Sequence, residues 1–345
     1  MAAAAQGQYA IEKATSDDAS RASLVVLRDD KAKVEAAIAP SKGGELTSLR
    51  VHHKGKWIET IYLARDYSPR ADWTGKAPLL WPATGQNMPA DLLKRRAAGE
   101  QINQGAWEHD GKRYPMPGHG FARDSPWKLE SSEAGSDSAR ARLSFVDSDV
   151  TRKYYPFGFH LSVEYELKGG ALAISYRVHA DAANRGEMPF SIGNHITFNT
   201  PLVTGGDAGK MVFISPSKTR LIRGDNGVPT GESEPRFHGD GIALGDFERR
   251  IPISLSGYQG EPWMELRDPQ GLTIRMSHKA SSIPEQPVIL FNVWGDPPDG
   301  YFSPEPWVGL QNSLVLQEGI TRLEPGDDFD WTIRVEVIRR PDSVK

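Results

Sequence analysis

A strict alternation of apolar and polar residues dominates this sequence and restricts the folds open to it. The clearest example is FGFHLSVEYELKGGALAISYRV, residues 157–178, in which two alternating runs flank Gly169-Gly170. A period of two puts successive side chains on opposite faces of a strand, and paired glycines between such runs are typical of a tight turn. The stretch therefore predicts an antiparallel β-hairpin with one buried face.

The same pattern recurs along the chain. MELRDPQGLTIRMSH, residues 264–278, alternates around a turn at 268–271, and FDWTIRVEVI, residues 329–338, predicts a C-terminal strand. With 34 Gly and 25 Pro punctuating short strands in 345 residues, the chain is predicted to be all-β. One helix is expected at residues 90–101, where leucines recur at helical spacing inside an apparent insertion.

The chain is expected to form one large β-sandwich domain over residues 21–340, because strand-like segments continue across every Gly/Pro cluster. Residues 1–20 are expected to be a flexible leader, and residues 132–140 to be mobile. The N-terminal residues lack the charged and apolar regions of an intact signal peptide. They fit an ordinary leader or the remnant of a removed export signal, so both a cytoplasmic and an exported location stay open.

Composition narrows the classes of partner. The formal net charge is −4, which gives no support to nucleic acid or an anionic membrane as the partner. There are no cysteines, so disulfides and thiolate chemistry are excluded, and no apolar run approaches the length of a membrane span. His52-His53 has no third ligand at useful spacing, so no metal site is expected. A small-molecule partner and a monomer or weak homodimer are expected.

Three short stretches concentrate chemically capable residues: MPGHGFARDSPW (116–127), SIGNHITFNTP (191–201) and YFSPEPWVGLQN (301–312). Glycines flank His119 and leave its imidazole room beside a ligand. His195 stands in an otherwise apolar strand, where an unpaired polar group is costly. Glu305 lies between two prolines that stiffen its segment. Taken singly, each has a structural explanation: a surface histidine, a hydrogen-bonded core histidine and a loop glutamate.

Taken together, the three residues have the composition of a sugar site. Carbohydrates present C–H faces that aromatic rings cover, and hydroxyls that carboxylates, amides and imidazoles bind. A Glu and a His can also exchange protons near neutral pH. The aromatic residues near these stretches in the sequence are Trp81, Trp107, Phe121, Trp294 and Trp307.

At these stretches the sequence resembles the aldose 1-epimerase (galactose mutarotase) family, with gaps, from about residue 43 to residue 337. PLLWPATGQ (78–86), HGFAR (119–123), MPFSIGNHITFN (188–199), PEPW (304–307) and LEPGDDFDW (323–331) are similar to family motifs and stand in the family's order. The resemblance implies a galactose-mutarotase-like supersandwich, a large twisted antiparallel β-sandwich. It also implies a cofactor-independent isomerase, so no cofactor is expected.

The resemblance further implies roles for individual residues. His195 is the expected general acid and Glu305 the expected general base, and His119 is expected to bind substrate or support the acid. Trp307 and Phe121 are the leading candidates for an aromatic platform. The full set of candidate substrate-binding residues is His119, Arg123, Gln86, Asn194, Phe121, Trp307 and Trp294.

The sequence departs from the family pattern at three points. Gln86 stands where the family commonly has Arg, Asn194 and Ile196 flank His195 where close relatives have Gly and Pro, and the family's hydroxyl-binding aspartate has no clear counterpart. Three alternatives to a mutarotase of free aldohexoses therefore stay open. One is a hexose-6-phosphate mutarotase, for which Arg123 could bind phosphate. The others are a non-catalytic sugar-binding protein and a polysaccharide-active domain whose groove is built by residues 89–115.

Overall fold

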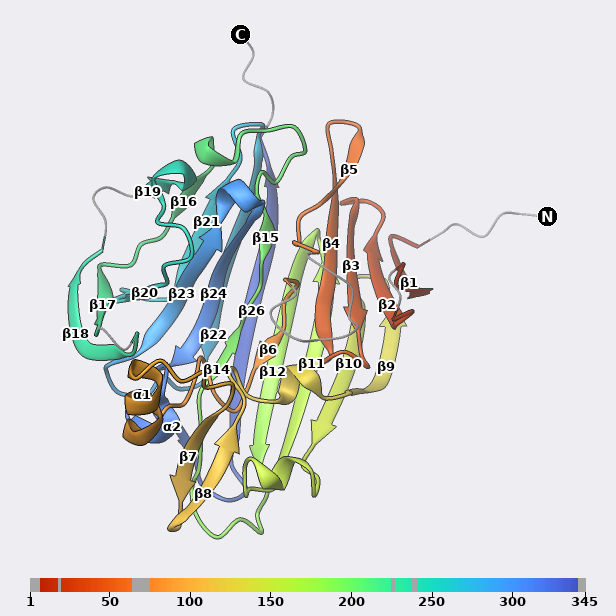
Figure 1. Ribbon diagram of the computed structural model, residues 1–345. Helices are drawn as coiled ribbons and strands as arrows, with labels where there is room; N and C mark the ends of the chain where they lie inside the picture. The colour runs from red at the N-terminus through yellow and green to blue at the C-terminus, as the bar shows by residue number, and fades with distance from the viewer. Residues whose placement is uncertain (1–6, 18–19, 64–74, 225–226, 237–240, 341–345) are drawn as a thin grey trace.

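The computed structural model describes residues 7–17, 20–63, 75–224, 227–236 and 241–340. Long antiparallel strands dominate it, so the all-β prediction is confirmed (Figure 1). Within these ranges the longest sheet has nine strands. In spatial order they are β19 (Gly241–Ala243), β16 (Val212–Ile214), β21 (Trp263–Arg267), β22 (Leu272–Ala280), β26 (Asp328–Arg339), β12 (Ala171–Ala180), β11 (Phe159–Lys168), β10 (Ala139–Val146) and β9 (Lys128–Ala134).

A second large sheet carries two of the three stretches with chemically capable residues, 191–201 and 301–312. As far as the described residues show, it has eight strands. In spatial order they are β18 (Pro229–Pro235), β17 (Thr219–Arg223), β20 (Ile253–Ser256), β23 (Ile289–Asp296), β24 (Tyr301–Gly309), β14 (Ile192–Asn194) and β6 (Leu79–Leu80), with β15 (Phe198–Asn199) also paired to β24.

Side chains from the two large sheets meet in a shared core. Phe213 of β16 and Phe302 of β24 are fully buried, with ring centroids 5.6 Å apart. His278 of β22 accepts a hydrogen bond from the Trp331 indole at 3.1 Å and contacts the carbonyl of Leu290 in the other sheet at 2.7 Å. Burial lowers the pKa of His278 to about 4, so this histidine is a neutral link between the layers rather than part of a site.

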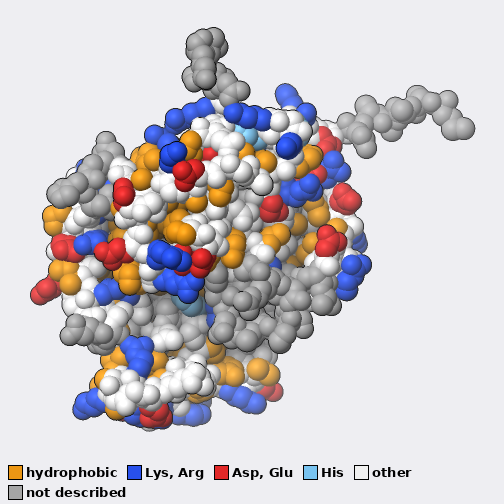
Figure 2. Space-filling model, turned by 45° about the horizontal axis from the view of Figure 1, so that its top comes forward, with side chains coloured by type: hydrophobic (Ala, Val, Ile, Leu, Met, Phe, Trp, Pro, Cys, Tyr) orange, Lys and Arg blue, Asp and Glu red, His pale blue; other side chains and the backbone are white. Residues whose placement is uncertain are grey.

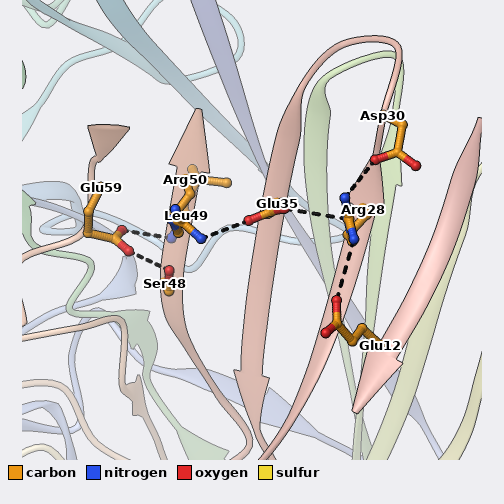
Figure 3. Close-up of polar contacts among 8 residues, drawn as sticks. All are labelled: Glu12, Arg28, Asp30, Glu35, Ser48, Leu49, Arg50 and Glu59. Atoms are coloured by element: carbon orange, nitrogen blue, oxygen red, sulfur yellow. Dashed lines mark hydrogen bonds and ion pairs between the residues drawn. The ribbon is translucent and has the colours of Figure 1, made fainter. Parts of the chain in front are cut away.

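A five-stranded sheet forms the N-terminal part of the described chain. Its strands are β1 (Tyr9–Thr15), β2 (Ser23–Asp29), β3 (Val34–Ala39), β4 (Glu45–His53) and β5 (Lys56–Glu59). The expected flexible leader is therefore wrong for residues 9–15, because β1 pairs with β2 along its whole length. Ion pairs cross the strands from Glu12 to Arg28, Glu35 and Arg50 (Figure 3). Short-range alternation in residues 9–15 is too weak to reveal this pairing.

The insertion at residues 89–115 folds into a small subdomain. It holds the expected helix, α1 (Ala90–Ala97), and a hairpin of β7 (Gly105–His109) and β8 (Lys112–Met116). Leu92 of α1 is buried with Met88 and Ala106. In Figure 1 these elements lie with α2 at one end of β14. The remaining elements are α2 (Ser313–Leu316), the pair β13 (Met188–Phe190) and β25 (Thr321–Leu323), and the 3₁₀ turns η1 (Ala122–Asp124), η2 (Thr151–Lys153), η3 (Ala208–Lys210), η4 (Leu244–Asp246) and η5 (Pro297–Asp299).

Both predicted hairpins are confirmed. Lys168 pairs with Ala171 across Gly169-Gly170, and Arg267 pairs with Thr273 across the second turn. Residues 132–140 were expected to be mobile, but most of them belong to the β9–β10 hairpin. The helices of the described ranges are all too short and polar to cross a membrane. Figure 2 shows basic and acidic side chains interspersed over one face, in keeping with the small net charge.

Candidate active site

His195 lies where an apolar strand breaks. The sequence suggested one continuous strand, but β14 ends at Asn194 and pairing resumes only at Phe198. The backbone N–H of His195 donates to the carbonyl of Pro78 at 2.9 Å, and the imidazole Nδ1 lies 3.5 Å from the hydroxyl of Thr197. His195 is only 6% exposed. These local contacts fix the ring with Nε2 facing Glu305.

Glu305 lies in the middle of β24 and is almost fully buried. Its Oε1 accepts from Nδ2 of Asn292 at 3.2 Å, and its Oε2 accepts from the indole N–H of Trp307 at 3.1 Å. Trp307 reaches it because residues two apart on a strand share a face. Gly193 makes room for the indole, since a Cβ there would lie 2.6 Å from a ring carbon.

His195 and Glu305 face one another, with Nε2 and Oε1 3.5 Å apart. Burial raises the pKa of Glu305 to about 8, although the hydrogen bonds from Asn292 and Trp307 and the charge of Arg223 oppose that shift. Burial also lowers the pKa of His195 to about 3, with Arg123 contributing in the same direction. Near neutral pH the free pair therefore holds one proton, on Glu305, and both groups are uncharged.

His119 completes a triangle of polar groups. Its ring centroid is 5.6 Å from that of His195 and 6.2 Å from that of Trp307. The residue has a φ of +65°, and Gly120 after it approaches the Trp81 carbonyl so closely that a Cβ would lie 2.0 Å from it. The backbone N–H of Gly85 donates to His119 Nδ1 at 3.1 Å. Burial holds the pKa of His119 well below its usual value, so the ring is neutral and carries its proton on Nε2.

Two of the expected substrate-binding residues lie at the margin of this group. Arg123 is the last residue of HGFAR and lies in η1. Its charge lowers the pKa of both His119 and His195. Gln86 is exposed, and its Oε1 accepts from Arg96 of α1 at 3.2 Å. The insertion therefore brings a guanidinium to the position where Gln86 replaces the family's arginine.

The aromatic residues near the pair differ in exposure. Phe121 is buried in the core against Trp81, with ring centroids 5.7 Å apart, and its expected role in binding stays a prediction. Trp307 is also buried, and its indole serves Glu305 instead of offering an open face. Trp294 is half-buried, with its centroid 5.8 Å from His195 and 5.3 Å from Tyr301. Of these three aromatic residues, Trp294 is the most exposed.

Asn194 does not join the site. Its Nδ2 donates to the carbonyl of Ala77 at 3.1 Å and to the hydroxyl of Tyr176 at 3.2 Å. Adjacent strand residues point to opposite faces, so Asn194 at the end of β14 faces the nine-stranded sheet while His195 faces Glu305. Its expected role in substrate binding is therefore replaced by a structural one.

Sequence reasoning missed two residues that contact the pair directly or through one neighbour. Asn292 interrupts the apolar run ILFNVWG, the same signal that drew attention to His195, and could have been found. Arg223 gives no such signal, because TRLIRG resembles an ordinary surface strand. Its guanidinium donates to Asn292 at 3.2 Å, to Ser254 at 2.6 Å and to Gln311 at 2.7 Å.

Comparisons with known proteins bear on the same residues. The family model described as aldose 1-epimerase matches residues 97–238, which contain His119 and His195. This match covers less than half of the chain and shows a similarity to the aldose 1-epimerase family over these residues. The family match ends before Glu305, so the position of that carboxylate opposite His195 comes from the fold.

Individual relatives are distant. The chain is 27% identical over 116 residues to a putative glucose-6-phosphate 1-epimerase of Escherichia coli K12, covering 34% of this chain and 35% of that protein. It is 28% identical over 165 residues to the chromosomal LacX protein of Lactococcus lactis, covering 47% of each. The chain thus spans less than half the length of these curated relatives.

A solved structure matches over nearly the whole length. A galactose mutarotase-like protein from Clostridium acetobutylicum has a TM-score of 0.73 at 19% identity, covering 96% of this chain and 99% of that one. At this identity the match shows the fold. The galactose-mutarotase-like supersandwich implied by the sequence motifs is confirmed.

Proposed function

We propose that this chain is a mutarotase that interconverts the α and β anomers of an aldohexose by opening and closing the sugar ring. The observation that carries the proposal is the His195–Glu305 pair, a buried acid and base 3.5 Å apart. His119 and half-buried Trp294 lie around it and supply a hydrogen-bond donor and an aromatic face. The match of residues 97–238 to the aldose 1-epimerase family model supports the same chemistry.

The reaction needs one proton to leave and another to arrive. Glu305 takes the proton from the anomeric hydroxyl while His195 gives one to the ring oxygen. The bond from the anomeric carbon to the ring oxygen breaks, its electrons go to that oxygen, and an aldehyde forms. Rotation about the adjacent carbon–carbon bond then presents the other face of the aldehyde. Closure reverses both proton transfers and yields the other anomer.

The protonation of the free pair fits one stage of this cycle. After ring opening, Glu305 is protonated and His195 is neutral, which is the state that burial favours in the free site. A closed ring requires the proton on His195 instead, so the substrate's hydroxyls must favour its transfer across the pair. The pair is active when His195 and Glu305 share one proton. The pair with two protons and the pair with none are therefore inactive.

A phosphorylated hexose is a second candidate substrate. Arg123 and Arg96 lie at the margin of the site, and guanidinium groups suit phosphate recognition. The Escherichia coli relative is named a putative glucose-6-phosphate 1-epimerase. Arg96 in particular could replace the charge missing at Gln86.

Polarimetry tests the proposal. Fresh α-D-glucose, α-D-galactose and α-D-glucose 6-phosphate are each followed to anomeric equilibrium with and without the protein. Acceleration of any of the three supports a mutarotase, and the ratio of rates assigns the substrate class. Saturable sugar binding by calorimetry without acceleration would instead identify a sugar-binding protein. A preference for oligosaccharides in the same titration would favour a polysaccharide-active domain.

A further inference from the structure

A row of polar side chains crosses four neighbouring strands and ends at Glu305. Leu221 of β17 pairs with Ser254 of β20, Ser254 pairs with Asn292 of β23, and Asn292 pairs with Glu305 of β24. Directly paired residues project to the same face of a sheet. Arg223, two residues after Leu221 at the end of β17, reaches this row through its hydrogen bond to Ser254.

The hydrogen bonds along this row run in one direction. Arg223 Nη2 donates to Ser254 Oγ at 2.6 Å and to Asn292 Oδ1 at 3.2 Å. Ser254 Oγ also lies 3.2 Å from Asn292 Oδ1. Asn292 Nδ2 then donates to Glu305 Oε1 at 3.2 Å. We call Arg223, Ser254, Asn292 and Glu305 the cross-strand relay.

The direction follows from the chemistry of its first member. A guanidinium has five donors and no acceptor, whereas an amide can present either end to a neighbour. Because Arg223 can only donate, Asn292 must turn its oxygen toward Arg223 and its amino group toward Glu305. Asn292 therefore offers Glu305 a donor. A neutral residue at position 223 would remove this constraint and let the amide reverse.

We propose that Arg223 is a positioning residue for the general base, acting through Asn292 to hold the Glu305 carboxylate toward His195. This inference rests on the proposed function. Arg223 is itself held by neutral groups, with Nη1 bonded to Gln311 at 2.7 Å and to the carbonyl of Gly227 at 2.8 Å. Both of these partners are uncharged, so neither compensates the positive charge of Arg223.

That charge has a second consequence for Glu305. The ionisable groups that act on the His195–Glu305 pair or on the neighbouring His119 are Arg223, which acts on Glu305, and Arg123, which acts on both histidines. Both histidines are neutral, and Arg223 lowers the pKa of Glu305 against the effect of burial. Removing the charge at position 223 should therefore make Glu305 release its proton only at higher pH.

The pH dependence of mutarotation tests this role in Arg223→Met and Arg223→Lys. In Arg223→Met we expect the alkaline limb to move up by on the order of one pH unit. We also expect kcat to fall at least tenfold with KM little changed. Arg223→Lys keeps the charge and donors and should keep the limb of the wild type. The matched control is Arg220→Met, since Arg220 lies on the same strand but pairs with Glu234.

An alkaline limb in Arg223→Met that coincides with the wild type would overturn the proposal, because loss of packing alone would lower the rate at every pH. A second measurement does not depend on activity. In protein labelled with ¹³C at glutamate carboxyls, the Glu305 resonance is assigned by its loss in Glu305→Gln and titrated in each variant. An unchanged titration in Arg223→Met would also overturn the relay. A shift in a protein without mutarotase activity would retain the relay and reject the proposed function.

Discussion

Two glutamates in this molecule, half-buried Glu59 and fully buried Glu305, both have a raised pKa but differ in their partners. Burial raises the pKa of both Glu59, at the end of β5, and Glu305, in β24. Glu59 accepts from the backbone N–H groups of Leu49 and Ile61, at 2.9 and 3.0 Å, and from the hydroxyl of Ser48 (Figure 3).

Glu305 has side-chain partners instead. Both of its oxygens accept from side chains, Asn292 and Trp307, and it faces a histidine. Backbone donors cannot move without moving the sheet, so Glu59 joins β4 to β5 and to the chain that follows. Side-chain donors can reorient when the carboxyl group gains or loses a proton. A raised pKa is therefore common to both carboxylates, and their hydrogen-bond partners distinguish them.

The largest expected effect is on the mutarotation rate, and it comes from making the same Glu→Gln substitution at each of the two glutamates. Glu305→Gln keeps the shape of the site but removes the base, so the mutarotation rate should fall by roughly 10²–10⁴. Glu59→Gln, its matched control, should leave the rate unchanged. His195→Asn should resemble Glu305→Gln, and the double variant should be little worse than the poorer single one, because the pair acts as a unit. Equal polarimetric rates for wild type and Glu305→Gln would mean that the base is another residue.

The second expected effect is on pH dependence. The pair is active with one proton, and Glu305 loses that proton as the pH rises through its pKa of about 8. The rate should therefore be level near neutral pH and fall roughly tenfold for each further pH unit above about 8. Glu59→Gln should follow the same curve. A wild-type rate that keeps rising through pH 9 would contradict the one-proton requirement.

The third expected effect is on stability, and here the substitution of Glu59 is the one expected to have the effect. Glu59→Ala removes the acceptor for two backbone N–H groups, Leu49 and Ile61, and should lower the free energy of unfolding by about 1–3 kcal/mol. Urea denaturation at pH 7 measures this. The rate per folded molecule should stay that of the wild type. A stable Glu59→Ala protein that has lost activity would show that the N-terminal sheet takes part in catalysis.

The smallest expected effect concerns aromatic contacts near each glutamate. Trp294→Ala should weaken sugar binding by about 0.5–1.5 kcal/mol if the ring stacks on the substrate. Trp57→Ala, on the same strand as Glu59 and 38% exposed, should leave affinity unchanged. Isothermal titration carried to saturation with sugar compares the dissociation constants of the two variants. Equal affinity in both variants would remove Trp294 from the site.

The fold was largely predictable because its signal is local. The alternation in residues 157–178 and 264–278 specifies hairpins whatever the rest of the chain does. The N-terminal strand was missed because Tyr9–Thr15 depends on pairing with β2 more than on its own pattern. The break after Asn194 was missed because it depends on the contact between the His195 backbone and Pro78, 117 residues earlier in the chain.

The site was predictable only in part, for a related reason. His119, His195 and Glu305 stood out because a polar residue in an apolar or conformationally restricted segment needs an explanation. Their convergence within a few ångströms is confirmed. The orientation of aromatic rings gives no such signal, so buried Phe121 resembled half-buried Trp294. Arg223 could not be identified from the sequence, because an arginine at the end of a strand suggests no role until its neighbours across the sheet are known.

Glu305 and Trp307 have a further consequence as neighbours on one face of β24. A slip of that strand by one residue against β23 would turn both side chains to the opposite face at once and bring Pro304 and Pro306 to the catalytic position. Misaligned molecules would then have no mutarotase activity rather than a reduced rate. The mutarotation rate per mole of protein would report the fraction of chains with β24 correctly aligned, and refolding followed by this assay would time the alignment of β24 with β23.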